Sequence, residues 1–151
     1  MKRINLFKHF TIALAAIGSL IMLCSYAPSS NTTNHDNEDL ELLKMVVREM
    51  QSELPLDIED GMSISEVYVT NTHFVMEYTC PNNFVEMLRL GMDNNSKAEF
   101  IKNMQVDESS TLLLNICVDA GVGARFIFTN KSYSNQVRIE YSVDELRHSL
   151  R

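Results

Sequence analysis

The sequence predicts an α+β domain with a four-stranded antiparallel sheet of two hairpins packed with helices, in the order α-ββ-αα-ββ-α. Two stretches, 62–80 and 125–141, each hold a pair of segments in which apolar and polar residues alternate, which is typical of β-hairpins. Around them, apolar residues recur at the spacing of amphipathic helices. Because the strands are grouped and do not alternate singly with helices, we expect the sheet to be antiparallel.

The first predicted helix spans residues 40–54. Its apolar residues recur three or four positions apart, as on one buried helix face: Leu43, Val46, Val47, Met50 and Leu54. Pro55 ends this helix, because proline lacks a backbone N–H and clashes with a helical residue before it. The acidic connection at 56–61 does not match the spacing of a calcium loop and is predicted to be a solvated turn.

The first predicted hairpin joins strands at 62–70 and 73–80 through a turn at Asn71 and Thr72. The second of these strands alternates strictly, so its two faces should differ. One face should carry Phe74, Met76, Tyr78 and Cys80, and the other His73, Val75, Glu77 and Thr79.

Helices are predicted between the hairpins, with start signals after Pro81, at 96–99 and at 107–110. The segment 112–118 is apolar nearly all round, which predicts the most buried helix and the centre of the core. Gly121 and Gly123 fit a C-terminal helix stop.

The second predicted hairpin pairs a strand at 125–130 with an alternating strand that ends at Tyr141. A turn rich in serine and asparagine, at 131–135, connects the two strands. The capping box at 142–145 then opens a short C-terminal helix that carries Leu146 and Leu150.

Residues 1–29 have the order of a secretory signal peptide or membrane anchor. A basic start is followed by the uncharged, almost wholly apolar segment 10–23, which is short for a full membrane span. Ala27 and Ser29 satisfy the rule for ordinary cleavage before Ser30. Lipidation of Cys24 and an uncleaved anchor stay open as alternatives. All three predict export, to the periplasm or to the outer membrane or cell surface.

The polar residues 30–38 are predicted to be a flexible linker, and residues 39–151 a single domain. The formal net charge is −7, and the first 30 residues hold Lys2, Arg3 and Lys8 with no acid. The remainder therefore carries a charge of −10, which argues against nucleic acid as a partner. We expect contact with a membrane only through the N-terminal segment.

Cys24 directly follows the apolar run and resembles the lipid-modified cysteine of bacterial lipoproteins. The domain itself resembles small exported bacterial proteins of unknown function, with lipoprotein-like members. The resemblance is carried by the segments 61–67, 76–78 and 115–119, together with Gly121, Phe126 and Phe128. It implies an exported location and the fold, and it implies no activity.

Cys80 and Cys117 are the cysteines of the predicted domain, and they form a candidate disulfide if the domain is exported. The alternative is two buried free thiols, which a domain of this size tolerates because it does not need a covalent staple. Paired zinc ligands, a glycine-rich phosphate loop and a GxSxG motif are all missing from the sequence. We therefore predict no catalytic residues, no cofactor and no metal.

Two classes of function remain open on these observations. The first is a non-enzymatic binding or accessory domain of the cell envelope, whose partner is an envelope protein or a small ligand. The second is a small envelope hydrolase with a cleft near His73. The first is favoured because no nucleophile motif is present. A deep cleft that holds His73 with a carboxylate would favour the second.

Overall fold

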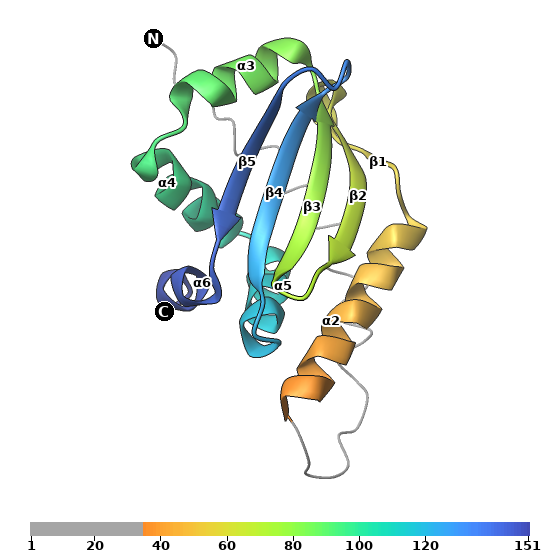
Figure 1. Cartoon of the computed structure of the whole chain (residues 1–151), viewed down its shortest axis with the longest axis vertical. Helices are drawn as coiled ribbons and strands as arrows, with labels where there is room; N and C mark the ends of the chain where they lie inside the picture. Colours follow the sequence, from red (N-terminus) through yellow and green to blue (C-terminus); the bar gives the residue numbers. More distant parts are fainter. Residues whose placement is uncertain (1–34) are drawn as a thin grey trace.

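The structure is a computed structural model, and it describes residues 35–151 (Figure 1). These residues form five α-helices and one five-stranded sheet, and the predicted α+β class is confirmed. The elements are α2 (His35–Ser52), β1 (Leu56–Asp57), β2 (Ser63–Val69), β3 (His73–Cys80), α3 (Asn82–Gly91), α4 (Asn94–Met104), α5 (Glu108–Asp119), β4 (Gly123–Asn130), β5 (Gln136–Tyr141) and α6 (Val143–Ser149). The first helix thus includes residues 35–38, which the sequence analysis assigned to the linker.

The strand order is β1-β2-β3-β4-β5, and the predicted fold is wrong in three respects: the sheet has five strands, one pair of strands is parallel, and three helices lie between the two hairpins where two were predicted. The two predicted hairpins exist as β2–β3 and β4–β5, but β3 and β4 pair in parallel, with His73 opposite Gly123 and Cys80 opposite Asn130. A parallel pair needs a long crossover connection. The helices α3, α4 and α5 supply it, because they return the chain to the end of the sheet where β3 begins.

The additional strand, β1, lies in the connection that was predicted to be a turn. Leu56 pairs with Ile64 and Asp57 with Ser63, so that a two-residue strand covers one end of β2. Two residues are too few to produce an alternating pattern, so periodicity could not reveal this strand.

The helices cover one face of the sheet, and the other face lies open toward the viewer in Figure 1. The strand β3 follows the predicted division of faces. Its residues Phe74, Met76, Tyr78 and Cys80 are at most 1% exposed and belong to the core shared with the helices. This alternation matches the two-residue period of a strand and confirms the prediction.

The helix α5 lies behind the sheet (Figure 1), and most residues of its apolar segment 112–118 are buried, as predicted. Leu113, Leu114 and Cys117 are 0% exposed, whereas Asn115 is exposed. The helix ends as a Schellman motif around Gly121, whose φ of 70° is left-handed. There Val122 N–H donates to the Cys117 carbonyl at 2.9 Å. Gly123, the second predicted stop residue, instead begins β4.

Candidate functional site on the open face of the sheet

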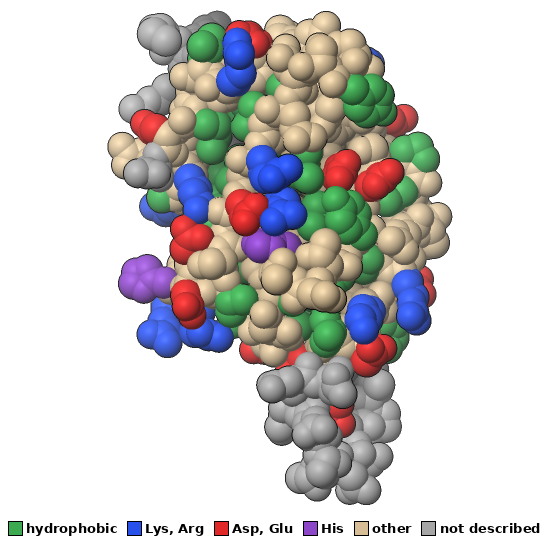
Figure 2. All heavy atoms as spheres, in the orientation of Figure 1, with side chains coloured by type: hydrophobic (Ala, Val, Ile, Leu, Met, Phe, Trp, Pro, Cys, Tyr) green, Lys and Arg blue, Asp and Glu red, His purple; other side chains and the backbone are tan. Residues whose placement is uncertain are grey.

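The uncovered face of the sheet is lined by alternate residues of β2 to β5, and we call it the open face. Figure 2 shows that acidic, basic and histidine side chains gather on it. Its members are Glu66, Tyr68, His73, Val75, Glu77, Thr79, Arg125, Ile127, Thr129, Gln136, Arg138 and Glu140. Val75 and Ile127 are 0% and 5% exposed although no helix covers them. The long polar side chains of the open face therefore shield an apolar centre beneath them.

Three charged or titratable side chains meet at the end of the open face where β3 begins. The Glu140 carboxylate accepts a hydrogen bond from Arg125 Nε at 2.7 Å, and its other oxygen lies 3.2 Å from His73 Nε2. Arg125 and Glu140 are direct cross-strand partners on β4 and β5. The His73 ring packs over Gly123, its neighbour in the parallel pair β3–β4. The parallel pairing is therefore what brings His73 to Glu140.

A hollow of about 440 Å³ lies beside this cluster. It is lined by Asn71, Thr72, His73, Gly121, Glu140, Ser142, Val143 and Glu145. Most of these residues are exposed, so the hollow is a shallow depression of the surface. The structure thus joins His73 to a carboxylate, but not in the deep cleft that would favour a hydrolase.

Thr72 is the hydroxyl residue next to His73, with its Oγ1 2.9 Å from His73 Nδ1. A nucleophile at this position would need free N–H donors to stabilise a developing oxyanion. The nearby N–H groups are already used, because Thr72 and His73 donate to Thr70 Oγ1 and Gly123 donates to the Thr72 carbonyl. The arrangement therefore favours a fixed turn over a catalytic centre.

The pKa of the Glu140 carboxyl is lowered, first by the hydrogen bond from Arg125, while partial burial opposes the shift. A group whose pKa is lower in the folded state stabilises the fold above its unfolded pKa of about 4.3, and this contribution is lost as the pH falls through the folded pKa. We expect Glu140→Gln to lower the free energy of unfolding at pH 7 by at most about 1 kcal/mol, because the side chain is 40% exposed.

The measurement for this prediction is denaturant unfolding at pH 7 and below pH 4. The difference between wild type and Glu140→Gln should shrink at the lower pH. Glu99→Gln, which changes an exposed carboxylate on α4, is the control and should show a smaller difference at both values. An effect of Glu140→Gln that grows toward low pH would contradict the assignment of this ion pair.

Cys80 and Cys117 are both free thiols in the structure, and each is 0% exposed within the same core. Burial raises the pKa of Cys80 to about 12 and raises that of Cys117 as well. Since the thiolate is the reactive form, both groups should be poor nucleophiles in the folded protein. A catalytic role for either cysteine is therefore disfavoured.

Whether the two cysteines form a disulfide in an exported protein stays a prediction, and we expect two thiols. Thiol titration of the protein, unfolded without reductant, should detect both Cys80 and Cys117. The folded protein should react slowly, because both side chains are buried. If neither thiol reacts after unfolding, and the unfolding midpoint falls on reduction, the two residues are bridged.

The predicted lipidation residue Cys24, the signal or anchor segment 1–29 and most of the linker lie outside the described residues. Within residues 35–151, no helix is long and apolar enough to span a membrane. The same described part of the chain contains no group of three histidine, cysteine or carboxylate residues arranged for a metal ion.

Arg125 and Glu140, which complete the cluster around His73, were not singled out from the sequence. Alternation places both on the outer face of the second hairpin, and this was the available signal. Their meeting with His73 could not be derived, because it depends on which strands are neighbours.

Comparison with solved structures shows a related fold in exported and secretion-associated proteins. A proposed secreted protein of Pseudomonas aeruginosa aligns with a TM-score of 0.59 and 14% identity, over 80% of this chain and 100% of that chain. The type II secretion system pilotin AspS of Vibrio cholerae aligns with a TM-score of 0.51 and 9% identity. The Vibrio vulnificus pilotin EpsS aligns equally well, at 7% identity. Both pilotin alignments cover 74% of this chain and 94% of the other.

No family model and no curated protein matches the chain by sequence. At these low identities, the structural likeness establishes the fold alone.

Proposed function

We propose that this chain is an exported, non-enzymatic protein of the cell envelope that binds another envelope protein, a role that we call pilotin-like after two of the solved structures whose fold it shares. The observation that carries the proposal is the likeness of nearly the whole described domain to two pilotins and to a proposed secreted protein. The basic, apolar and then polar order of the first thirty residues supports export independently.

The surface of the domain also supports a binding role. The hollow at His73 is shallow, and the backbone donors around it are engaged within the fold. An open sheet face with only a shallow hollow at His73 suits contact with a protein better than enclosure of a small substrate. The partner is therefore proposed to be a protein.

Fractionation of cells that produce the protein tests the export part of this proposal. We expect the protein in the envelope fraction, with an N-terminus that differs from Met1 if the signal is cleaved. Incorporation of labelled palmitate that Cys24→Ala abolishes would identify the lipidated form. A cytoplasmic protein that retains Met1 would contradict export.

Comparison of envelope proteins between wild-type cells and cells lacking this chain tests the binding part. We expect one envelope protein to lose abundance or change membrane fraction, and to co-purify with the chain from wild-type cells. An unchanged set of envelope proteins would contradict a pilotin-like role.

A hydrolase is the second candidate, and the contacts of His73 with Thr72 and Glu140 favour it. Assays of the purified protein with ester and peptide substrates discriminate between the two. If an activity is found and both Thr72→Val and His73→Ala abolish it while the fold is retained, the hydrolase replaces the binding role. If cells with either variant keep the abundance and membrane fraction of the envelope proteins that depend on the chain, the binding role stands.

A further inference from the structure

We infer that the outer edge of β5 binds an extended peptide of a partner protein as an added antiparallel β-strand, with an acidic side chain of that peptide beside Arg138. This inference rests on the proposed binding function and names the surface and the kind of segment that it recognises. Strand addition supplies affinity through backbone hydrogen bonds and specificity through alternate side chains.

The pairing of β4 determines which backbone groups of β5 point outward. Asn130 N–H donates to the Asn135 carbonyl on the β5 side, whereas Gly123 N–H donates to the Thr72 carbonyl on the β3 side. Backbone groups alternate in direction along a strand, so even-numbered residues of β4 pair with β5. In the observed register, these residues bond Val137, Ile139 and Tyr141.

The N–H and carbonyl groups of Gln136, Arg138 and Glu140 therefore point away from the sheet. The sheet ends at β5, and no described residue makes a hydrogen bond to these backbone groups. Unpaired edge groups of this kind are a template for another strand. At the opposite edge, by contrast, β1 covers one end of β2 and the Gln51 side chain donates to the Val67 carbonyl at 2.8 Å.

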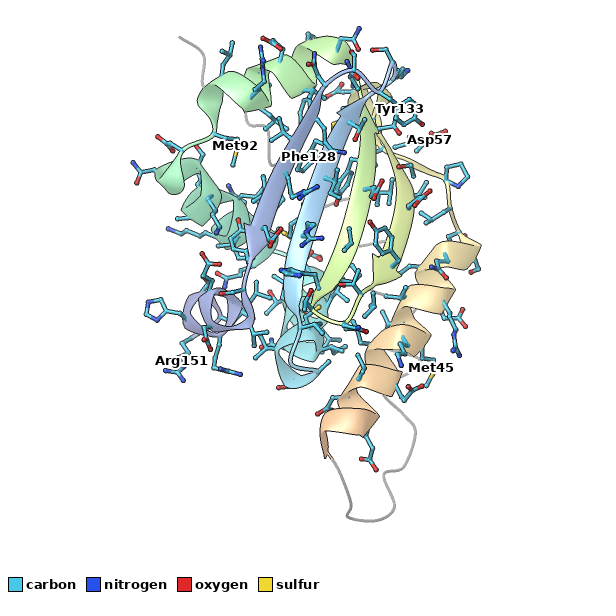
Figure 3. All side chains as sticks on the ribbon, viewed as in Figure 1. Met45, Asp57, Met92, Phe128, Tyr133 and Arg151 are labelled. Atoms are coloured by element: carbon cyan, nitrogen blue, oxygen red, sulfur yellow. The ribbon has the colours of Figure 1, made fainter. Side chains whose placement is uncertain are left out.

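The outer edge of β5 is exposed to solvent at Gln136 and Arg138. In Figure 1, α3 and α4 extend beyond this edge on the helix-covered side of the sheet. The helix α4 is held at the end of β5, where the Tyr141 hydroxyl donates to the Lys97 carbonyl at 2.6 Å. In Figure 3, Met92 lies at the connection between α3 and α4, and its partly buried side chain packs against the core. An added strand would thus have α3 and α4 on one side and solvent on the other.

A second copy of the chain suits this edge less well than a peptide. Two copies joined through β5 would share one continuous sheet, with their helices on the same side. Because α3 and α4 already reach beyond β5, the equivalent helices of the two copies would meet in the same space. A single extended segment avoids that collision.

Charge indicates the kind of segment. Arg138 is exposed and forms no ion pair with any described residue, whereas Glu140 is already engaged by Arg125 and His73. Residues directly opposite in an antiparallel pair place their side chains on the same face. A carboxylate opposite Arg138 would therefore meet it on the open face, and the alternate side chains would face the helices. A segment with one acidic residue opposite Arg138, neutral polar residues elsewhere on that face and apolar residues at the alternate positions fits both sides and places no like charge opposite Glu140.

The test uses the protein isolated from the envelope and the probe acetyl-Val-Thr-Val-Glu-Val-Thr-Val-amide, whose threonines avoid a like charge opposite Glu140. With the glutamate opposite Arg138, the N–H groups of the glutamate and the threonines face β5 and those of the valines face away. Methylation of the glutamate and threonine nitrogens should abolish binding, and methylation of the valine nitrogens should preserve it. On binding the parent peptide, the amides of Gln136, Arg138 and Glu140 should become protected from hydrogen exchange.

Two variants at position 138 separate the contribution of the backbone N–H to peptide binding from the contribution of the side-chain charge. Arg138→Pro removes an N–H that makes no bond within the sheet, and an edge strand tolerates proline there. It should weaken peptide binding at least about tenfold, whereas Arg138→Ala, which keeps the N–H, should weaken it only about threefold to fivefold. Unfolding midpoints of both variants serve as the control for folding.

Equal binding of the two methylated peptides, or full binding to a folded Arg138→Pro variant, would overturn the inference. Oligomerisation that depends on Arg138 in the absence of peptide would overturn it in favour of a second copy. These results are separable from the proposed function. An envelope partner that Arg138→Pro still binds leaves the pilotin-like role intact and removes only the edge of β5 as its site.

Discussion

Leu113→Ala is expected to lower the free energy of unfolding by about 2–5 kcal/mol, the range for truncation of a large side chain in a packed core. Leu113 is 0% exposed, and it lies on α5 among core residues of α2, the sheet and α6. Removing its side chain loses apolar burial and leaves a cavity that the surrounding elements cannot close without moving. Denaturant unfolding measures the effect directly.

Asn115→Ala is the matched control, because it changes an exposed residue of the same helix. Its side chain donates only to the Thr111 carbonyl at 3.0 Å, so we expect a change within about 0.5 kcal/mol. A loss below about 0.5 kcal/mol for Leu113→Ala would mean that α5 is peripheral to the core in solution.

Gly123→Ala should destabilise the protein by about 3 kcal/mol, at the upper end of the range for overpacked positions. A Cβ atom at this position would collide with the Tyr141 carbonyl and lie 3.0–3.1 Å from two atoms of the His73 ring. The carbonyl belongs to the backbone of β5, so relief would require movement of paired strands. The His73 ring would also have to leave its place beside Glu140.

Gly91→Ala provides the comparison, since no atom outside its chain neighbours and its own helix backbone lies within 4 Å of the added methyl group. Gly91 is the last residue of α3, and alanine there should be neutral or stabilising by up to about 1 kcal/mol. Thermal and denaturant unfolding of both variants checks the contrast. Equal stabilities of the Gly123→Ala and Gly91→Ala variants would show that β4 and β5 can move apart at Gly123 at little cost in free energy.

Gly123 and the edge of β5 connect the fold to the proposed role. The close packing of β3, β4 and β5 holds Arg125, Glu140 and His73 together at one end of the open face. It also holds the outward backbone groups of Gln136, Arg138 and Glu140 in one row. An edge strand that is already paired on its inner side lowers the entropic cost of binding an extended segment, because the template is formed before binding.

Local patterns were enough to predict the helices, the two hairpins and the inward face of β3. Apolar side chains at a period of two or of about 3.6 must be buried together, so the pattern is visible in the order of residues. The Schellman end of α5 at Gly121 also followed from local chemistry, because glycine adopts positive φ without steric cost. The expectation that Gly123 belongs to the same stop failed, because its need for glycine arises from packing against His73 and Tyr141.

The sequence by itself determined the α+β class, the division of polar and apolar faces, and the prediction of an exported chain. Only the tertiary structure decided that β3 and β4 run parallel, that His73 meets Glu140 and Arg125, and that β5 is an open edge. The two-residue period of a strand shows which side chains face the core. This period is the same whether the neighbouring strand runs parallel or antiparallel. Strand order depends on how α3, α4 and α5 carry the chain across the sheet, which the packing of the whole domain decides.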